Sequence, residues 1–320
     1  MKILANDGIS KSGIKALENA GFEVISTKVA QEQLTKFINE EKINVLLVRS
    51  ATQVRKDLID SCPSLKIIGR GGVGMDNIDV SYARSKDLKV INTPSAGSES
   101  VAELVFAHLF GGVRYLHDSN RNMPLSGDSH FKDLKKNYSA GTELKGKTLG
   151  IIGIGRIGKE VAKLALGVGM KVIASDNHVG ELDITLKFYN DQVVTLPIKT
   201  EPVADLIKHS DFITIHVPAQ AKPVLGKKEF EQMKHGVGII NTSRGGLINE
   251  EALLDGLEHG KVAFAGLDVY ENEPTPSIKI LMNERISLTP HIGAATLEAQ
   301  DRIGMELAEQ IIAILKNEKV

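Results

Sequence analysis

The sequence contains one cysteine, Cys62, among its 320 residues. A single cysteine excludes an intrachain disulfide and leaves no basis for a cysteine metal site, so we expect no bound metal. Long apolar runs are also missing, because no stretch approaches the roughly 18 residues that cross a bilayer. The opening segment MKILANDGIS breaks its short apolar run at Asn6 and Asp7, which argues against a secretory signal. These absences predict a cytoplasmic protein with no membrane partner.

An excess of charge of either sign is missing as well. The 39 basic and 40 acidic residues nearly cancel, so composition gives no reason to expect a nucleic-acid or anionic-lipid partner. The 42% hydrophobic and 25% charged content is that of an ordinary globular protein. A length of 320 residues exceeds the usual size of a single core, which predicts two domains.

Short apolar runs alternate with segments of helical spacing, which predicts an α/β fold with mainly parallel sheets. The predicted strands of a first unit, which ends near residue 95, are MKILAND, FEVIST, INVLLVRS, LKIIGRGG and LKVINTP. A second unit opens at residues 148–158 with TLGIIGIGRIG, and its later strands are MKVIASD, DFITIHVP, VGIINTS, AFAGLDVY and ISLTP.

Four other segments are assigned by their pattern. Residues 98–123 predict one long amphipathic helix, and the Lys-rich stretch 126–147 predicts a polar surface loop. The alternating, β-branched segment 180–200 departs from the strand-helix alternation and favours an extra strand or hairpin. The last predicted helix, residues 297–317, has one apolar face, formed by Ile303, Leu307, Ile311 and Ile312.

Gly153, Gly155 and Gly158 form a G-x-G-x-x-G motif directly after an apolar strand and at the start of a helix. The three glycines suit a tight turn, a close approach to pyrophosphate and close packing of helix on strand, and the helix N-terminus favours phosphate. Asp176 ends the next strand, about 20 residues on, where a carboxylate can accept hydrogen bonds from both ribose hydroxyls. Because this carboxylate would repel a 2′-phosphate, the motif predicts NAD rather than NADP.

Three strand ends of the second unit carry polar residues, at the edge where open α/β sheets bind ligands. Arg244 follows one strand, Asp268, Glu271 and Glu273 lie on and after the next, and His291 follows the last. Histidine suits the proton movement that accompanies hydride transfer at a hydroxyl-bearing carbon. An acid beside it would favour the imidazolium, and an arginine would bind a substrate carboxylate. The residues alone leave open which acid this is. They also leave open two simpler interpretations, that Arg244 forms a surface salt bridge and that the loop acids are merely solvated.

The chain resembles the D-isomer-specific 2-hydroxyacid dehydrogenases over nearly its whole length. The motifs that carry the resemblance are GRGGVGMDNID, SVAELV, GTELKGKTLGIIGIGRIG, DFITIHVP, INTSRGGLINEEAL, GLDVYENEP and TPHIGAAT. The resemblance implies two Rossmann-like, doubly wound parallel-sheet domains, with the NAD domain inserted into the substrate domain. The implied substrate (catalytic) domain is 1–95 plus 291–320, and the implied NAD-binding domain is 96–290.

The resemblance makes Arg244 the substrate-carboxylate arginine, Glu273 the supporting acid and His291 the catalytic acid/base. It favours Glu273 over Glu271 because the family places this acid directly before a proline, here Pro274. NAD is the implied cofactor. Its implied contacts are Gly153, Gly155, Arg156, Ile157, Gly158, Asp176, His216, Val217, Pro218, Thr242, Ser243, Arg244, Asp268, His291, Gly293 and Ala294.

Within the family, the chain is similar to the branch that oxidises 3-phospho-D-glycerate to 3-phosphooxypyruvate, the first step of phosphorylated L-serine biosynthesis. The implied substrate-binding residues are Arg49, Ser50, Arg70, Gly72 and Val73. Arg49 and Arg70 end strands of the first unit, where they could hold a phosphate, and a pair of surface arginines is the alternative. Lys135 and Lys136 are further candidates for phosphate contact and are otherwise solvated. The implied partner is a small phosphorylated 2-hydroxy acid, and the family implies a homodimer.

Two departures from the family pattern matter. The chain ends at residue 320, so we expect no C-terminal regulatory domain and no feedback control by serine through it. Ser95, Ala96 and Gly97 follow Pro94 where family members often carry Gly-Asn, so an asparagine contact to substrate is missing or replaced. Two other functions stay open, a hydroxypyruvate/glyoxylate reductase and a non-catalytic NAD-sensing scaffold like the C-terminal-binding-protein corepressors.

Overall fold

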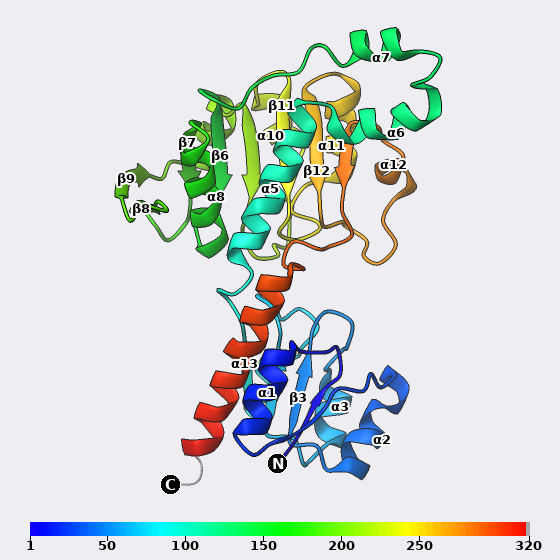
Figure 1. Ribbon diagram of the computed structural model, residues 1–320, viewed down its shortest axis with the longest axis vertical. Helices are drawn as coiled ribbons and strands as arrows, with labels where there is room; N and C mark the ends of the chain where they lie inside the picture. Colours follow the sequence, from blue (N-terminus) through cyan, green and yellow to red (C-terminus); the bar gives the residue numbers. More distant parts are fainter. Residues whose placement is uncertain (318–320) are drawn as a thin grey trace. The chain divides into compact units, whose positions relative to one another are not determined.

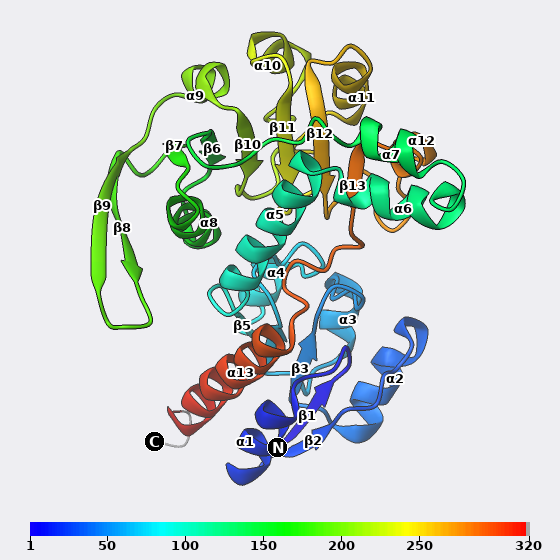
Figure 2. The same cartoon turned by 45° about the horizontal axis from the view of Figure 1, so that its top comes forward.

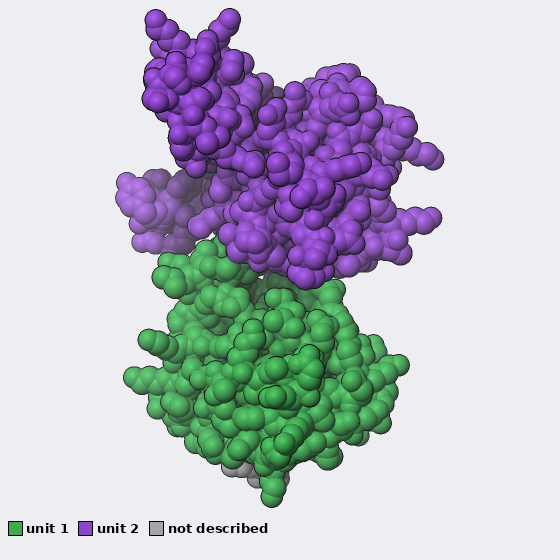
Figure 3. Space-filling view, turned by 90° about the vertical axis from the view of Figure 1, so that its right-hand side faces the viewer, with its two compact units in different colours: residues 1–100, 294–320 green, residues 101–293 purple. Residues whose placement is uncertain are grey.

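The structure is a computed structural model that describes residues 1–317, so the predicted domain end at residue 320 lies outside the described residues. The chain divides into two compact units, coloured separately in Figure 3. Unit 1 comprises Met1–Ser100 with Ala294–Val320, and unit 2 comprises Val101–Gly293. Each unit is built on its own parallel sheet, which confirms the predicted α/β class with two doubly wound domains.

Unit 1 contains a five-stranded sheet in the order β2-β1-β3-β4-β5, and every pair of neighbouring strands is parallel. The strands are β1 (Lys2–Ala5), β2 (Glu23–Ile25), β3 (Val45–Val48), β4 (Ile67–Arg70) and β5 (Lys89–Asn92). The helices are α1 (Lys11–Asn19), α2 (Gln31–Glu41), α3 (Lys56–Ser61), α4 (Val80–Ser85) and α13 (Leu297–Asn317).

Alternation along β3 shows why both faces of this sheet are covered. Val45 and Leu47 join the cluster that includes α1 and α13. Leu46 and Val48 join the cluster of α2, α3 and α4 on the opposite face. A fully apolar strand therefore has no face left for solvent, as expected for a parallel sheet.

The close packing of α13 on α1 depends on two glycines (Figure 1). A Cβ atom on Gly13 would lie 2.7 Å from the carbonyl oxygen of Gly304. Any larger residue would push the two helices apart, and the side chain of Ser10 caps α1 by accepting a hydrogen bond from the backbone N–H of Gly13.

Unit 2 contains a six-stranded, all-parallel sheet in the order β13-β12-β11-β10-β6-β7. The strands are β6 (Thr148–Ile152), β7 (Lys171–Ser175), β10 (Phe212–Ile215), β11 (Val237–Asn241), β12 (Val262–Leu267) and β13 (Ile286–Leu288). The helices are α5 (Ser98–Val113, which starts in unit 1), α6 (Leu116–Ser126), α7 (Phe131–Asn137), α8 (Arg156–Gly167), α9 (Val203–His209), α10 (Lys227–Gln232), α11 (Glu250–Glu258) and α12 (Ile278–Leu281).

Helices α5 and α8 cover one face of this sheet, and α9, α10 and α11 cover the other. Phe212 of β10 packs into the first of these cores, whereas Ile213 and Ile215 pack into the second. Among residues 1–317, no helix is both long enough and apolar enough to cross a membrane.

The extra strands expected in residues 180–200 form an antiparallel hairpin, β8 (Glu181–Lys187) and β9 (Val193–Lys199). Its apolar face packs on the α8 side of unit 2, where Ile184 and Ile198 are buried (Figure 2). The far end of the hairpin projects from the unit, and Tyr189 at the turn is fully exposed. The prediction of a hairpin here is therefore confirmed.

Two predicted segments were wrong in detail. The single helix over 98–123 is interrupted at Tyr115, whose left-handed backbone (φ 54°) separates α5 from α6. The predicted polar loop 126–147 contains the helix α7. Long-range contacts explain the second error, because the hydroxyl of Tyr138, just after α7, donates to Asp118 of α6 and accepts from Asn122. These bonds hold the segment that contains α7 against α6, a contact that local composition does not reveal.

Candidate active site

The loop between β6 and α8 holds the glycine motif in a conformation that its residue types require. Gly153 has φ 93°, a region that side chains disfavour, and a Cβ there would lie 2.5 Å from the carbonyl oxygen of His216. A Cβ on Gly158 would overlap the carbonyl of Gly153, whereas a Cβ on Gly155 would meet no atom within 4 Å. Gly155 is the N-cap of α8, so the open side of this turn lies beside the free N–H groups of a helix start.

The two residues after Gly155 differ in their surroundings. Arg156 is exposed at the first position of α8. Ile157 is partly buried and packs on the core under α5 and α8. Of these two predicted cofactor contacts, Arg156 therefore has the more exposed side chain.

Asp176, directly after β7, ties two turns together at the same sheet edge. Its Oδ2 accepts a hydrogen bond of 3.0 Å from the backbone N–H of Ile154, and its Oδ1 accepts one of 2.8 Å from that of His178. A carboxylate oxygen can accept more than one hydrogen bond, so both oxygens retain capacity for ribose hydroxyls. The carboxylate is held one strand away from the glycine turn, where a dinucleotide needs it.

Two buried polar atoms at neighbouring strand ends have no hydrogen-bond partner among the described residues. They are Nδ1 of His216, after β10, and Oγ1 of Thr242, after β11. Burial lowers the pKa of His216 to about 3, so its imidazole is neutral, and Nε2 contacts Thr214 at 2.9 Å. Buried polar groups are normally hydrogen-bonded, so these two atoms fit a polar ligand such as the cofactor. The glycine turn, Asp176 and these atoms together fit a bound dinucleotide.

The turn after β11 places Arg244 through a network of backbone contacts. Ser243 donates from Oγ to the carbonyl of Val217 at 2.7 Å, and Asn241 donates from Nδ2 to the carbonyl of Arg244 at 2.9 Å. The guanidinium donates from Nη1 to the carbonyl of Ser243 at 2.7 Å. Gly245 lies so close to the carbonyl of Tyr270 that a Cβ would overlap it, which explains a glycine here. Of the other predicted contacts in these loops, Pro218 is exposed.

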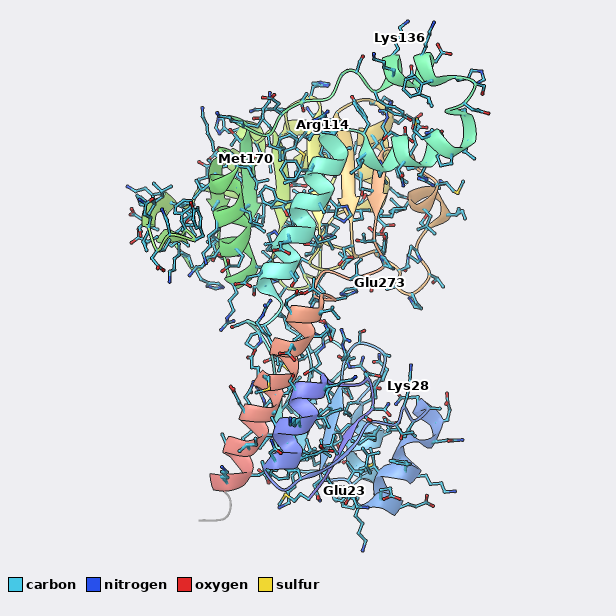
Figure 4. All side chains as sticks on the ribbon, in the orientation of Figure 1. Glu23, Lys28, Arg114, Lys136, Met170 and Glu273 are labelled. Atoms are coloured by element: carbon cyan, nitrogen blue, oxygen red, sulfur yellow. The ribbon has the colours of Figure 1, made fainter. Side chains whose placement is uncertain are left out.

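His291 and Glu273 form the acid-histidine pair. Nδ1 of His291 lies 2.8 Å from Oε2 of Glu273, and the backbone N–H of Tyr270 donates to Oε1 at 3.0 Å. The two side chains are 43% and 36% exposed, so a substrate can reach the pair. Figure 4 shows Glu273 in the loop beyond the carboxyl end of β12. Glu271 instead accepts from the backbone N–H of Glu250 at 3.0 Å, so the structure brings only Glu273 to the histidine.

Asp268 holds the backbone that follows the histidine. Its side chain is 1% exposed, and Oδ1 accepts from the hydroxyl of Thr289 at 2.6 Å and from the N–H of Ile292 at 2.8 Å. Its Oδ2 accepts from the N–H of Gly293 at 2.8 Å. His291 has φ 55°, an uncommon left-handed conformation for a residue with a side chain. These bonds stabilise a strained turn, so Asp268 acts on His291 through the backbone.

The predicted substrate residues lie in unit 1, at the carboxyl ends of two neighbouring strands. Arg70 ends β4 and pairs in register with Val48 of β3, so Arg49 is the next residue beyond that pair. The carboxylate of Asp7 accepts from the N–H of Arg49 at 2.7 Å, which pins its backbone. Gly72 has φ 140°, and a Cβ there would overlap the guanidinium of Arg70. The structure thus brings Arg49 and Arg70 together at one sheet edge.

The remaining predicted residues differ in where they lie. Ser50 and Val73 are exposed in unit 1. Ala294 also belongs to unit 1, one residue beyond the unit boundary. Lys135 and Lys136 are exposed in the last turn of α7, and none of the other predicted site residues lies on that helix; Figure 4 labels Lys136.

Three residues that contribute to this site were not predicted. Tyr270 donates from its hydroxyl to the carbonyl of Thr289 at 2.8 Å, and burial raises its pKa to about 12. Tyr270 and Thr289 lie inside the motifs GLDVYENEP and TPHIGAAT, so their nearness to Glu273 and His291 was a usable signal. His108 lies on α5 and contacts Thr289, and no local pattern in the sequence points to it.

The geometry of the site and a family comparison together identify the class of this protein. A Rossmann sheet with a glycine turn, a ribose acid and a histidine at its carboxyl edge is that of an NAD-binding dehydrogenase. Residues 106–293 match the family described as "D-isomer specific 2-hydroxyacid dehydrogenase, NAD binding domain". The chain belongs to this family, and it is an NAD-dependent dehydrogenase of D-2-hydroxy acids.

Sequence matches to named relatives extend over nearly the whole chain. It is 43% identical over 316 residues to a hydroxypyruvate reductase of Thermotoga maritima, covering 97% of each protein. It is 39% identical over 320 residues to a D-3-phosphoglycerate dehydrogenase of Methanocaldococcus jannaschii, covering 99% of this chain and 58% of that protein. The chain therefore spans under two thirds of that longer relative. Among solved structures, a glyoxylate reductase from Paecilomyes thermophila is 29% identical with a TM-score of 0.80, covering 97% of this chain and 93% of that one.

Proposed function

We propose that this protein oxidises 3-phospho-D-glycerate to 3-phosphooxypyruvate with NAD, the first step of phosphorylated L-serine biosynthesis in the cytoplasm. The observation that carries this choice is the placement of Arg49 and Arg70 at adjacent strand ends of unit 1. Two cations on neighbouring parallel strands, which run about 4.8 Å apart, favour an anion with more than one oxygen, such as a phosphate. Unit 1 is then the substrate domain.

In the proposed reaction, His291 takes the proton from the 2-hydroxyl group. Its Nδ1 is bonded to Glu273, so Nε2 faces the substrate, and the carboxylate stabilises the imidazolium that forms. Arg244 binds the substrate carboxylate and polarises the carbonyl that develops on the neighbouring carbon. NAD, which the glycine turn before α8 and Asp176 would hold, would supply the acceptor for the hydride that leaves the same carbon. His291 releases its proton to solvent after the ketone has formed.

A direct test of these roles compares His291→Gln, Glu273→Gln and Glu271→Gln. We expect His291→Gln to lower kcat about 100- to 10,000-fold, because a positioned acid/base contributes that much, while NADH binding by fluorescence titration is unchanged. Glu273→Gln should lower kcat about 10- to 100-fold, the cost of one charge-assisted hydrogen bond. Glu271→Gln is the matched control and should stay within about threefold. Equal losses in the two glutamate variants would contradict the assignment.

Reduction of hydroxypyruvate is the second candidate. It is supported by the Thermotoga relative, which is 43% identical and matched over 97% of its length. An unphosphorylated substrate would have no group for the two arginines of unit 1, so the candidates differ in what Arg70 does.

A substrate panel with NADH separates the two candidates. We expect kcat/KM for 3-phosphooxypyruvate to exceed that for hydroxypyruvate and glyoxylate. Arg70→Ala should lower kcat/KM about 10- to 100-fold for the phosphorylated substrate alone. Arg84→Ala, an exposed arginine on α4 of the same unit, is the control. Equal or faster turnover of the unphosphorylated acids, unaffected by Arg70→Ala, would support the reductase.

The proposed form in solution is a homodimer formed through unit 2. Its support is a set of large apolar side chains that are exposed on α5, α6 and the start of α7: Phe110, Leu116, Met123, Leu125 and Phe131. Contiguous exposed apolar surface commonly marks a protein interface. Sedimentation equilibrium on the wild type and on Leu125→Glu should give a dimer and a weakened dimer, and a wild-type monomer at all concentrations would contradict this proposal.

A further inference from the structure

Helix α5 carries a histidine that lies over β12, on the face of the sheet that α5 covers, and reaches β13 and the residue that follows it. His108 is 3% exposed, and it passes over β12 at Gly266, where a Cβ would lie 2.6 Å from the Cβ of His108. Next to β12, Nδ1 lies 2.9 Å from Oγ of Ser287 on β13, and Nε2 lies 3.2 Å from Oγ1 of Thr289. All of these residues belong to unit 2.

The hydrogen-bond directions along this chain of contacts follow from chemistry. Asp268 is a carboxylate and can only accept, so the hydroxyl of Thr289 donates its single proton to Oδ1, at 2.6 Å. Thr289 must then accept from Nε2–H of His108. A neutral imidazole with its proton on Nε2 has Nδ1 as an acceptor, which the hydroxyl of Ser287 satisfies. Every donor in the relay therefore points toward Asp268.

The neutral form of His108 agrees with its surroundings. Burial lowers the pKa of His108 to about 4, and the charge of His117 acts in the same direction. At neutral pH the imidazole thus keeps one donor and one acceptor, the state that the relay requires.

We propose that His108 is a positioning residue for the proton transfer, acting through Thr289 and Asp268 on the turn that carries His291. The two oxygens of Asp268 hold the N–H groups of Ile292 and Gly293, directly after the left-handed His291. Without a donor to Thr289, its oxygen loses one of the two contacts that orient it, so its bond to Asp268 weakens and the turn loses part of its support. Because hydrogen bonds in a buried chain polarise one another, loss at one end reaches the other.

This inference rests on the proposed role of His291 as the acid/base. Three variants at or beside His108 test it. In His108→Gln the amide nitrogen takes the place of Nε2 and still donates to Thr289. In His108→Asn the shorter amide reaches only the Nδ1 position, so Thr289 loses its donor. Leu109→Ala removes a fully buried side chain from the next position of α5 and destabilises the helix without touching the relay.

Steady-state kinetics and thermal melting are measured on all three full-length proteins. We expect His108→Asn to lower kcat about 10-fold with KM values within about twofold, because a misplaced catalytic group slows chemistry more than binding. His108→Gln should keep kcat near wild type. Leu109→Ala should lower the melting temperature and leave kcat unchanged.

A double-mutant cycle with Thr289→Val gives the sharpest result. If His108 acts through Thr289, the double variant with His108→Asn loses no more kcat than the larger single loss. Additive losses, equal losses in the Gln and Asn variants, or a comparable kcat loss in Leu109→Ala would overturn the proposal. His291→Gln, measured alongside, separates the two failures. Full activity in that variant refutes the acid/base role, whereas lost activity together with an unaffected His108→Asn refutes only the relay.

Discussion

The buried His108 predicts a measurable dependence of stability on pH. Its pKa is about 4 in the folded chain, against 6.5 when exposed in the unfolded chain. Between these two values the unfolded state binds more protons than the folded state, so the free energy of unfolding rises with pH. The contribution is fully present above pH 6.5 and is lost as the pH falls toward 4.

The size of this effect follows from the two pKa values. At pH 5 the exposed histidine is almost fully protonated and the buried one almost fully neutral, so the loss relative to pH 8 is about 2 kcal/mol. At pH 4 it approaches about 3 kcal/mol. His216, whose pKa burial lowers to about 3, adds a loss of the same sign.

Urea unfolding of the wild type and of His108→Leu, at pH 8, 7, 6 and 5 without cofactor, measures this contribution. We expect the difference in unfolding free energy between the two proteins to shrink by about 2 kcal/mol from pH 8 to pH 5, because leucine does not titrate. The variant retains the slope due to His216. A difference that stays constant across this range would show that His108 is not buried as a neutral group, and would remove the basis for the hydrogen-bond directions assigned above.

Three further predictions concern the cofactor loop and the hairpin. Gly158→Ala should raise the Kd for NADH at least about 10-fold by calorimetry, because its Cβ would overlap the carbonyl of Gly153, and unchanged binding would contradict the packing role. Asp176→Ser should shift the ratio of NADP to NAD affinity by about 10-fold toward NADP, since it removes a charge that repels a 2′-phosphate, and titration with both cofactors checks this. Ile184→Ala should cost about 2–5 kcal/mol in chemical unfolding, because it empties buried space under the hairpin. Tyr189→Ser, at the exposed turn, should stay within about 0.5 kcal/mol, and equal costs would contradict the packing described.

The sites that could be located from sequence are those governed by local rules. A glycine turn between a strand and a helix must lie at the carboxyl edge of a parallel sheet, and so must Asp176 at the end of the next strand. The same rule places Arg49 and Arg70 side by side once their strands are recognised as neighbours. The alternation of 180–200 likewise sufficed for a hairpin, because a period of two residues is a property of the strand itself.

Pairings across long stretches of chain could not be located in this way. Local sequence offers Glu271 and Glu273 equally, two residues apart in one loop. In the fold, Glu271 turns back to the start of α11, and Glu273 reaches His291. The break between α5 and α6 at Tyr115 also escaped, because the helical pattern continues through it and a single left-handed residue leaves no periodic trace.

The amino-acid sequence by itself therefore determined the fold class, the cofactor turn and the types of residue available for proton transfer. These follow from spacing and strand ends, which are short-range properties of the chain. Spacing and strand ends left Glu271 and Glu273 open, and the family resemblance favoured Glu273, which the tertiary structure brings to the histidine. Only the tertiary structure revealed the contact of His108 with Thr289, 181 residues later in the chain. Such contacts depend on how separate elements pack, and packing is set by the shape and burial of the whole core rather than by any local pattern.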